Sequence, residues 1–173
     1  MFFVIVITFV MVQRIVELIV AKRNERWARQ NGAIEYGANH YKYIVSLHTL
    51  FFISLIIEYT LHPTLINGWY FFFTLFILAQ GLRIWSLFSL GKYWNTKILI
   101  IPHSAKVSKG PYRFMKHPNY IVVAIELFTL PMIFGAYVTA ILFSLLNFIL
   151  IYFVRIPNEE VALQSLQVSS RQK

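Results

Sequence analysis

The chain has 173 residues, of which 58% are hydrophobic, 17% aromatic and 13% charged. Soluble domains average about 45–50% apolar and about 25% charged residues. This composition excludes a disordered chain and argues against a soluble enzyme, and the absence of cysteine excludes a disulfide scaffold. The sequence therefore predicts an all-α, polytopic membrane helix bundle with a single domain over residues 1–173.

Five apolar stretches are predicted to cross the membrane, because a helix spans the hydrocarbon core in about 20 residues, with a range of about 17–25. They are residues 1–21, 43–61, 69–90, 119–134 and 136–154. The break at Gly135–Ala136 predicts that the last two form a tight helical hairpin. Pro131 is expected to bend the fourth span, which is the shortest, near its end.

The net charge of +9 comes from 16 Lys and Arg residues against 7 Glu. All but two of the basic residues follow the first, third or fifth span, whereas the other two connections carry none. The positive-inside rule then predicts an N-terminus outside and a C-terminus in the cytoplasm, which five spans satisfy. The basic residues thus indicate topology in a lipid bilayer and not nucleic-acid binding. The first span starts at Met1 without a basic leader, so we expect an uncleaved anchor.

Ionisable residues inside spans are costly, and they often mark function. Arg14, Arg83 and Glu126 each lie eight residues from the cytoplasmic end of their span, a depth of about 12 Å. They could form one buried polar layer that positions an anionic substrate. Arg14 also shares a helical face with Glu17. The alternative is that both arginines snorkel to the lipid headgroups. Glu58, near the outer end of its span, is expected at the interface.

The cytoplasmic stretch from Gly91 to Pro118 carries the densest polar chemistry. Gly110–Pro111 predicts a turn. Pro118 suits the first position of the next helix and biases His117 away from the helical conformation. The helix start would face the cytoplasm, where its N–H groups and positive dipole end can bind a carboxylate or phosphate. His117 and Tyr120 would stand beside it.

A second cluster follows the fifth span and consists of Arg155, Glu159 and Glu160. Because both ends of the hairpin are cytoplasmic, we expect the two glutamates to lie beside His117. An anion-binding helix start, an imidazole, a tyrosine and paired carboxylates together suit a zwitterionic ligand. The alternative is an interfacial anchor loop followed by a solvated acidic tail.

Residues 110–120 and 155–163 resemble the isoprenylcysteine carboxyl methyltransferase family. The family shows Gly-x-Tyr, Arg-His-Pro-x-Tyr, a helical hairpin and Glu-Glu-x-x-Leu. The corresponding segments are Gly110–Tyr112, Lys116–Tyr120 and Glu159–Leu163. The chain departs from the pattern in two ways: Lys116 replaces the usual Arg, and Ile121–Val122 follows Tyr120 where a Gly is common. Arg and Lys are not interchangeable at a bidentate site.

The resemblance implies a methyltransferase that takes S-adenosyl-L-methionine from the cytoplasm and a lipophilic small-molecule or lipidated acceptor from the bilayer. It implies catalytic roles for Arg83, Arg155 and Glu160, substrate contacts for Arg14, Arg83 and Glu126, and a cofactor-binding part over residues 91–173. The implied cofactor-binding residues are Val107, Gly110, Tyr112, His117, Pro118, Tyr120, Glu159 and Glu160. No metal is expected. A prenylcysteine-like carboxylate, an alkylpyrone-like hydroxyl and a phospholipid amine are the acceptors left open.

Two other functions are compatible with these residues. Membrane sterol and steroid reductases end in a similar His-Pro-x-Tyr hairpin but bind NADPH, and this chain has little room for a dinucleotide. The other is a membrane module without enzymatic activity. The sequence leaves the oligomeric state open.

Overall fold

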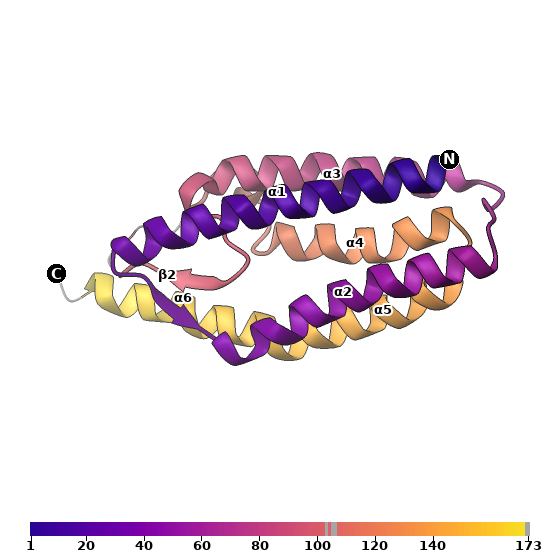
Figure 1. The fold of residues 1–173 in the computed structure, drawn as a ribbon. Coiled ribbons are helices and arrows are strands. Elements are labelled where there is room, and N and C mark those ends of the chain that lie inside the picture. The colour runs from indigo at the N-terminus through magenta and orange to yellow at the C-terminus, as the bar shows by residue number, and fades with distance from the viewer. Residues whose placement is uncertain (103, 105–106, 172–173) are drawn as a thin grey trace. The chain divides into compact units, whose positions relative to one another are not determined.

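The structure is a computed structural model that describes residues 1–102, 104 and 107–171, most of them helical (Figure 1). The chain divides into two compact units that interleave along the sequence. The first unit comprises Met1–Ala38, Leu90–Lys106 and Asn158–Lys173, and the second comprises Asn39–Ser89 and Val107–Pro157.

The first unit is built on α1 (Phe2–Gln30), which continues past the predicted end at Ala21. The extension is rich in Lys, Arg and Glu, which favour helices. Arg29 also donates from Nε and Nη2 to Glu25 one turn earlier, at 2.9 and 2.7 Å. Hydropathy predicts only the apolar part of this helix, because most of the residues after Ala21 are polar. The backbone stays helical through them.

A small two-stranded sheet, which the sequence did not predict, also belongs to the first unit. Strand β1 (Ile34–Tyr36) pairs antiparallel with β2 (Ile98–Ile100), with Ile34 opposite Ile100. The short 3₁₀-helix η1 (Gly91–Tyr93) precedes β2. Its end is tied to α1, because Asn24 Nδ2 donates to the carbonyl oxygens of Gly91 and Trp94, at 3.1 and 2.8 Å.

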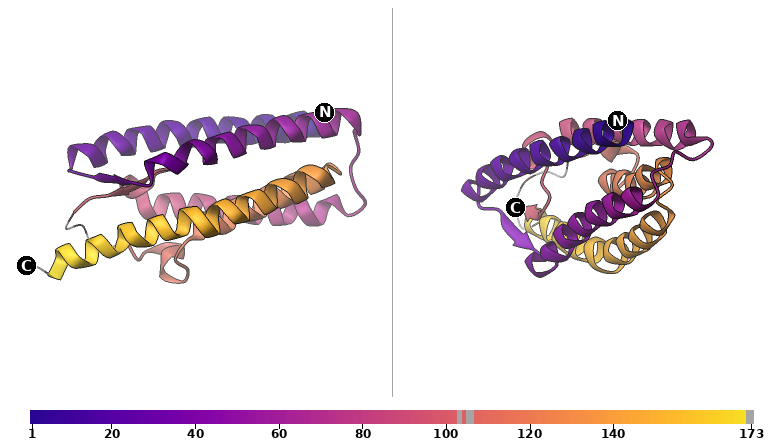
Figure 2. Two further views of the ribbon diagram at one scale, coloured as in Figure 1. Left: turned by 90° about the horizontal axis from the view of Figure 1, so that it is seen from below. Right: turned by 45° about the vertical axis from the view of Figure 1, so that its right-hand side comes forward.

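The second unit contains four helices, which Figures 1 and 2 show from three directions. They are α2 (Ala38–Leu61), α3 (Trp69–Leu90), α4 (Pro118–Ile133) and α5 (Tyr137–Leu150). The predicted hairpin is confirmed, because α4 and α5 pack against each other across a turn at Gly135. Gly135 has φ of 68°, and a Cβ there would lie 2.6 Å from Thr64 Oγ1, so the turn requires glycine.

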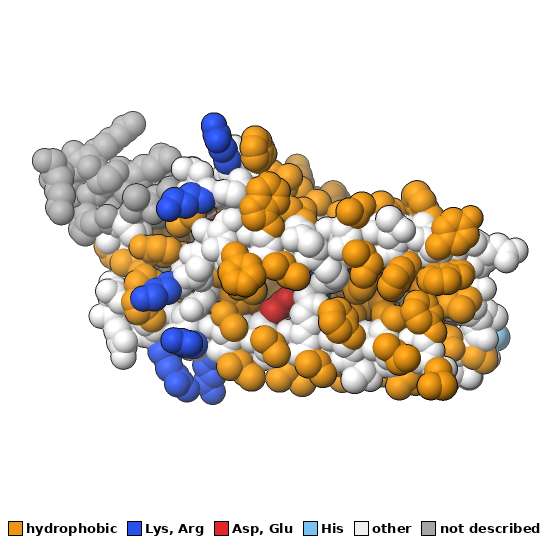
Figure 3. All heavy atoms as spheres, turned by 90° about the horizontal axis from the view of Figure 1, so that it is seen from above, with side chains coloured by type: hydrophobic (Ala, Val, Ile, Leu, Met, Phe, Trp, Pro, Cys, Tyr) orange, Lys and Arg blue, Asp and Glu red, His pale blue; other side chains and the backbone are white. Residues whose placement is uncertain are grey.

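Within the described residues, four helical segments are long and apolar enough to cross a membrane, as expected of an integral membrane protein. They are Phe2–Gln30, Ala38–Leu61, Trp69–Tyr93 and Tyr137–Gln164. The remaining predicted span, α4, has 16 residues and a length of about 24 Å. On the face drawn in Figure 3, hydrophobic side chains dominate the surface.

The predicted fifth span is not one regular α-helix. Helix α5 ends at Leu150, a π-helical turn, η3, covers Ile151–Arg155, and α6 (Ile156–Arg171) follows. Pro157 accounts for the irregularity, because it has no N–H for the carbonyl of Phe153 and its ring would clash with that carbonyl. Isolated π-turns within helices are frequent at functional sites.

Glu58 of α2 holds the start of α5. Its carboxylate accepts hydrogen bonds from the backbone N–H groups of Val138 and Thr139, at 3.0 and 2.8 Å, and from Thr139 Oγ1 at 2.6 Å. Thr139 Oγ1 also lies 2.8 Å from Ser54 Oγ. A carboxylate is stabilising at a helix N-terminus. Glu58, expected at the interface, therefore caps a neighbouring helix.

Candidate functional site

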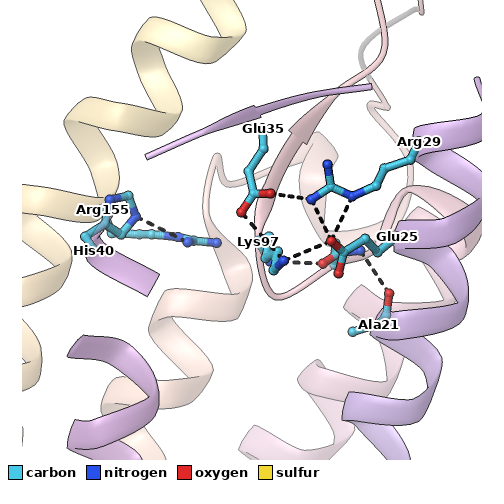
Figure 4. A network of polar contacts seen from close by, with 8 residues as sticks. Ala21, Glu25, Arg29, Glu35, His40, Lys97 and Arg155 are labelled. Atoms are coloured by element: carbon cyan, nitrogen blue, oxygen red, sulfur yellow. Dashed lines mark hydrogen bonds and ion pairs between the residues drawn. The ribbon is translucent and has the colours of Figure 1, made fainter. Parts of the chain in front are cut away.

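Arg155 is the centre of a polar contact chain in the second unit. Arg155 is the last residue of the π-turn η3 and is 7% exposed. The guanidinium donates from Nε to the hydroxyl of Tyr120 at 3.1 Å. Its Nη1 lies 3.4 Å from Nε2 of His40, a contact that Figure 4 shows. Arg155 thus links α4 to α2.

Residues 117–120, here termed the α4 start, have the conformation that the sequence predicts. Pro118 is the first helical residue, and His117 has φ of −131° and ψ of 63°, outside the helical region. The His117 ring stacks on the Tyr120 ring, with centroids 5.1 Å apart and 13° between the planes. The His117 side chain makes no capping hydrogen bond to the helix.

Gly110 and Tyr112 lie close to two helices. Gly110 opens the 3₁₀-helix η2 (Gly110–Arg113) at φ of 57°. A Cβ there would lie 1.9 Å from Ser89 Oγ and 3.0 Å from Trp85 Nε1, both on α3. Tyr112 accepts at its hydroxyl a hydrogen bond from Asn119 Nδ2, at 3.0 Å. The predicted binding residue Gly110 thus lies against the end of α3, and Tyr112 is hydrogen-bonded to the first turn of α4.

A second cluster of polar side chains lies between α3 and α4 of the same unit. The Glu126 carboxylate on α4 accepts from Gln80 Nε2 at 2.5 Å and pairs through its other oxygen with Arg83 of α3. The side chains of Arg83 and Glu126 are only 8% and 6% exposed. This geometry matches the predicted buried polar cluster and not a snorkelling Arg83. The prediction did not include Gln80, although its position one turn before Arg83 could have indicated it.

Arg14, the third predicted member of the buried layer, belongs to the first unit. Its Nη1 donates to Glu17 at 2.7 Å, so the predicted shared helical face is confirmed. Gln13 Nε2 donates to the same carboxylate at 3.0 Å.

Two further predicted residues differ in exposure. Glu159 and Glu160 both lie on α6, in the first unit; Glu159 is half-buried and Glu160 is exposed. Adjacent helical residues point about 100° apart, so these two carboxylates are not equivalent. Val107 is half-buried just before η2, whereas Lys116 is exposed.

The first unit contains an ion network that the sequence analysis treated only as topology (Figure 4). Glu25 Oε1 accepts from Lys97 Nζ at 2.9 Å, and Arg29 pairs with both Glu25 and Glu35. The hydrogen bond to Glu25, aided by the nearby charge of Glu35, raises the pKa of Lys97 above its usual value. These contacts connect α1, β1 and the segment just before β2.

Comparison with known proteins identifies the group of proteins to which this chain is related. Residues 72–165 match the model of the isoprenylcysteine carboxyl methyltransferase (ICMT) family. The chain belongs to this family. The Bacillus subtilis protein YpbQ, described as uncharacterized, is 47% identical to it over 167 residues, which cover 96% of this chain and 99% of YpbQ. An uncharacterized Haemophilus influenzae protein is 28% identical over 155 residues, which cover 88% of this chain and 90% of that protein. No solved structure matches the chain.

Membership of the ICMT family makes this protein a membrane methyltransferase in general terms. The matched segment begins in α3 and ends in α6, and it contains every residue predicted to bind a cofactor. It also contains the Gln80, Arg83 and Glu126 group. Arg14 and His40 both precede it.

Proposed function

We propose that this ICMT-family protein transfers a methyl group from S-adenosyl-L-methionine to a lipophilic acceptor held in the bilayer. The observation that carries the proposal is the contact of Arg155 with Tyr120. It sets a guanidinium beside the α4 start, where the first N–H groups of a helix already favour an anion.

The residues of the second unit fit the amino-acid end of such a cofactor. Its carboxylate suits the first-turn N–H groups of α4 together with Arg155, because hydrogen bonds between charged groups are the strong ones. The stacked His117 and Tyr120 rings give an aromatic surface next to this point, which suits a sulfonium. When bound, the cofactor supplies a methyl group on that sulfonium, which an acceptor attacks in line.

The other cofactor contacts are proposed from the family pattern. Glu159 or Glu160 accepts hydrogen bonds from the cofactor's ammonium or ribose hydroxyls, and Glu160 has the catalytic role. Residues 107–112 pack against the adenine. The close approach of Gly110 to α3 and the hydrogen bond of Tyr112 to Asn119 support this role, because methyl transfer depends mainly on alignment and exclusion of water.

The acceptor class depends on how the buried cations are paired. A carboxylate acceptor needs no base, whereas a hydroxyl or amine loses a proton. Arg83 already pairs with Glu126, so an anionic acceptor would compete with that carboxylate for it. We propose a catalytic role for Arg155 through its contact with the cofactor. Arg83, Glu126 and Arg14 are then proposed to line the approach from the bilayer.

We further propose an N-terminus outside and a cofactor site on the cytoplasmic side. All but two of the basic residues follow the first, third or fifth predicted span. Although α4 has only 16 residues, it forms a hairpin with α5. The chain therefore enters and leaves this hairpin on the same side. The orientation inferred from the charges therefore does not require α4 to be a full-length span.

Ligand binding to the purified protein in detergent tests this proposal. S-adenosylhomocysteine should raise the melting temperature, and NADPH should leave it unchanged. Arg155→Leu and Tyr120→Phe should weaken S-adenosylhomocysteine binding, whereas Arg113→Leu, which alters an exposed arginine of η2, should not. Stabilisation by NADPH alone would instead support a reductase, and no response to either compound would support a non-enzymatic module.

A further inference from the structure

His40 is a buried histidine that neither the sequence analysis nor the family segment includes. It lies in the first turn of α2 and is 6% exposed. Its Nε2 lies 3.4 Å from Arg155 Nη1, although the two residues are 115 positions apart in the chain.

The chemistry of this contact fixes the role of each partner. An arginine side chain can only donate hydrogen bonds, so His40 Nε2 is the acceptor and the imidazole is neutral, with its proton on Nδ1. A neutral acceptor orients a guanidinium without cancelling its charge. The contact between Arg83 and Glu126 differs, because a carboxylate orients its partner and neutralises it as well.

Two contacts from different helices help to orient the Arg155 guanidinium. Tyr120 of α4 holds Nε, and His40 of α2 holds Nη1. The guanidinium is a rigid plane, so contacts at two of its nitrogens set the orientation of the whole group. Removing His40 would take away one of these two orienting contacts.

We propose that His40 is a positioning residue for Arg155. It holds the guanidinium beside the α4 start in the orientation that meets the carboxylate of the cofactor's amino-acid end. This inference rests on the proposed function, because it assigns His40 to the same cofactor site.

Substitutions that keep or remove the acceptor test this role. His40→Leu removes the acceptor and keeps an apolar side chain of similar bulk, whereas His40→Gln retains an acceptor. His48→Leu is the matched control, since it makes the same change on α2 at a histidine whose Nδ1 lies 2.8 Å from the carbonyl oxygen of Ile44 in its own helix. For each variant we would measure the dissociation constant of S-adenosylhomocysteine in detergent and the melting temperature without ligand.

His40→Leu should weaken S-adenosylhomocysteine binding about tenfold, the effect of losing one hydrogen bond to a charged group. His40→Gln should stay within about twofold of the wild type, and His48→Leu should be unchanged. In an Arg155→Leu background, His40→Leu should cause no further loss of S-adenosylhomocysteine binding. If His40 had a purely structural role, its replacement would weaken binding in this background as well. If His40→Leu does not fold, His40→Met takes its place, because it is unbranched and a poor acceptor.

Three results would overturn the inference, and they separate it from the proposed function. If the wild-type protein does not bind S-adenosylhomocysteine, the proposed function fails and the role of His40 fails with it. If the wild type binds and His40→Leu binds equally well, only the role of His40 is wrong. If His40→Gln is as impaired as His40→Leu, the acceptor is not what matters at this position.

Discussion

Replacing Glu126 by glutamine should strongly destabilise the protein. The substitution keeps the size of the side chain and a carbonyl oxygen for hydrogen bonding, but it removes the negative charge that pairs with Arg83. Both side chains are less than a tenth exposed. The arginine would then keep its positive charge in a buried position after losing its carboxylate partner.

The expected size of the effect follows from this burial. Removing one partner of a buried ion pair costs about 3–5 kcal/mol. For a protein of about 150–250 residues, each kcal/mol lowers the melting temperature by about 2–4 °C. Glu126→Gln should therefore lower the melting temperature by about 6–20 °C. Gln80 can still hydrogen-bond to the new amide, which favours the lower half of this range.

Thermal unfolding in detergent, with and without S-adenosylhomocysteine, measures this change. The double variant Arg83→Met with Glu126→Leu should recover most of the lost stability, because apolar replacement of a buried ion pair is often neutral. Glu17→Gln on α1 is the comparison variant: the Arg14 side chain is 22% exposed and can extend to the headgroups, so the loss should be smaller than for Glu126→Gln.

Two outcomes would refute this reasoning. A melting temperature for Glu126→Gln within about 2 °C of the wild type would mean that Arg83 escapes to solvent or headgroups. A double variant as unstable as the single one would mean that shape, and not an unbalanced charge, causes the loss. Ligand binding by a stable double variant separates the structural role of the pair from a role in the site.

Two other predictions concern the loop and the ion network. Gly110→Ala should weaken S-adenosylhomocysteine binding and lower stability far more than Gly32→Ala. Both glycines have positive φ, but only at Gly110 would the new Cβ meet a neighbour, Ser89 Oγ at 1.9 Å. Equal losses in melting temperature would contradict this. The pKa of Lys97 is raised by Glu25, so its stabilising contribution is present at neutral pH and lost as pH rises through that raised pKa. Melting temperatures of wild type and Lys97→Met from about pH 8 to about pH 12 should converge at the alkaline end, and parallel curves would contradict this.

The features that the sequence predicts well are those with local causes. The apolar run 69–90 coincides with α3, because hydropathy and helix length act together there. Pro118 begins α4 as expected, because proline fits only the first turn of a helix and restrains the residue before it. The hairpin at Gly135 follows from a glycine between two apolar helices.

The features that the sequence could not predict depend on distant contacts. Strands β1 and β2 have three residues each, and each is stable only because the other pairs with it. Hydropathy averaged over a run of apolar residues does not indicate the π-turn before Pro157. His40 is a single histidine near a helix end, and only the fold shows that it contacts Arg155.

Several charged side chains of the chain hold parts of the fold together. Glu17, Glu25, Glu35 and Glu126 form ion pairs, and Glu58 caps a helix. Arg83 is held in the same way, because it pairs with the Glu126 carboxylate. A substitution at one of these positions should therefore lower stability first. The contacts of Arg155 with the hydroxyl of Tyr120 and the imidazole of His40 instead place its guanidinium beside the α4 start, so a substitution there should affect ligand binding first.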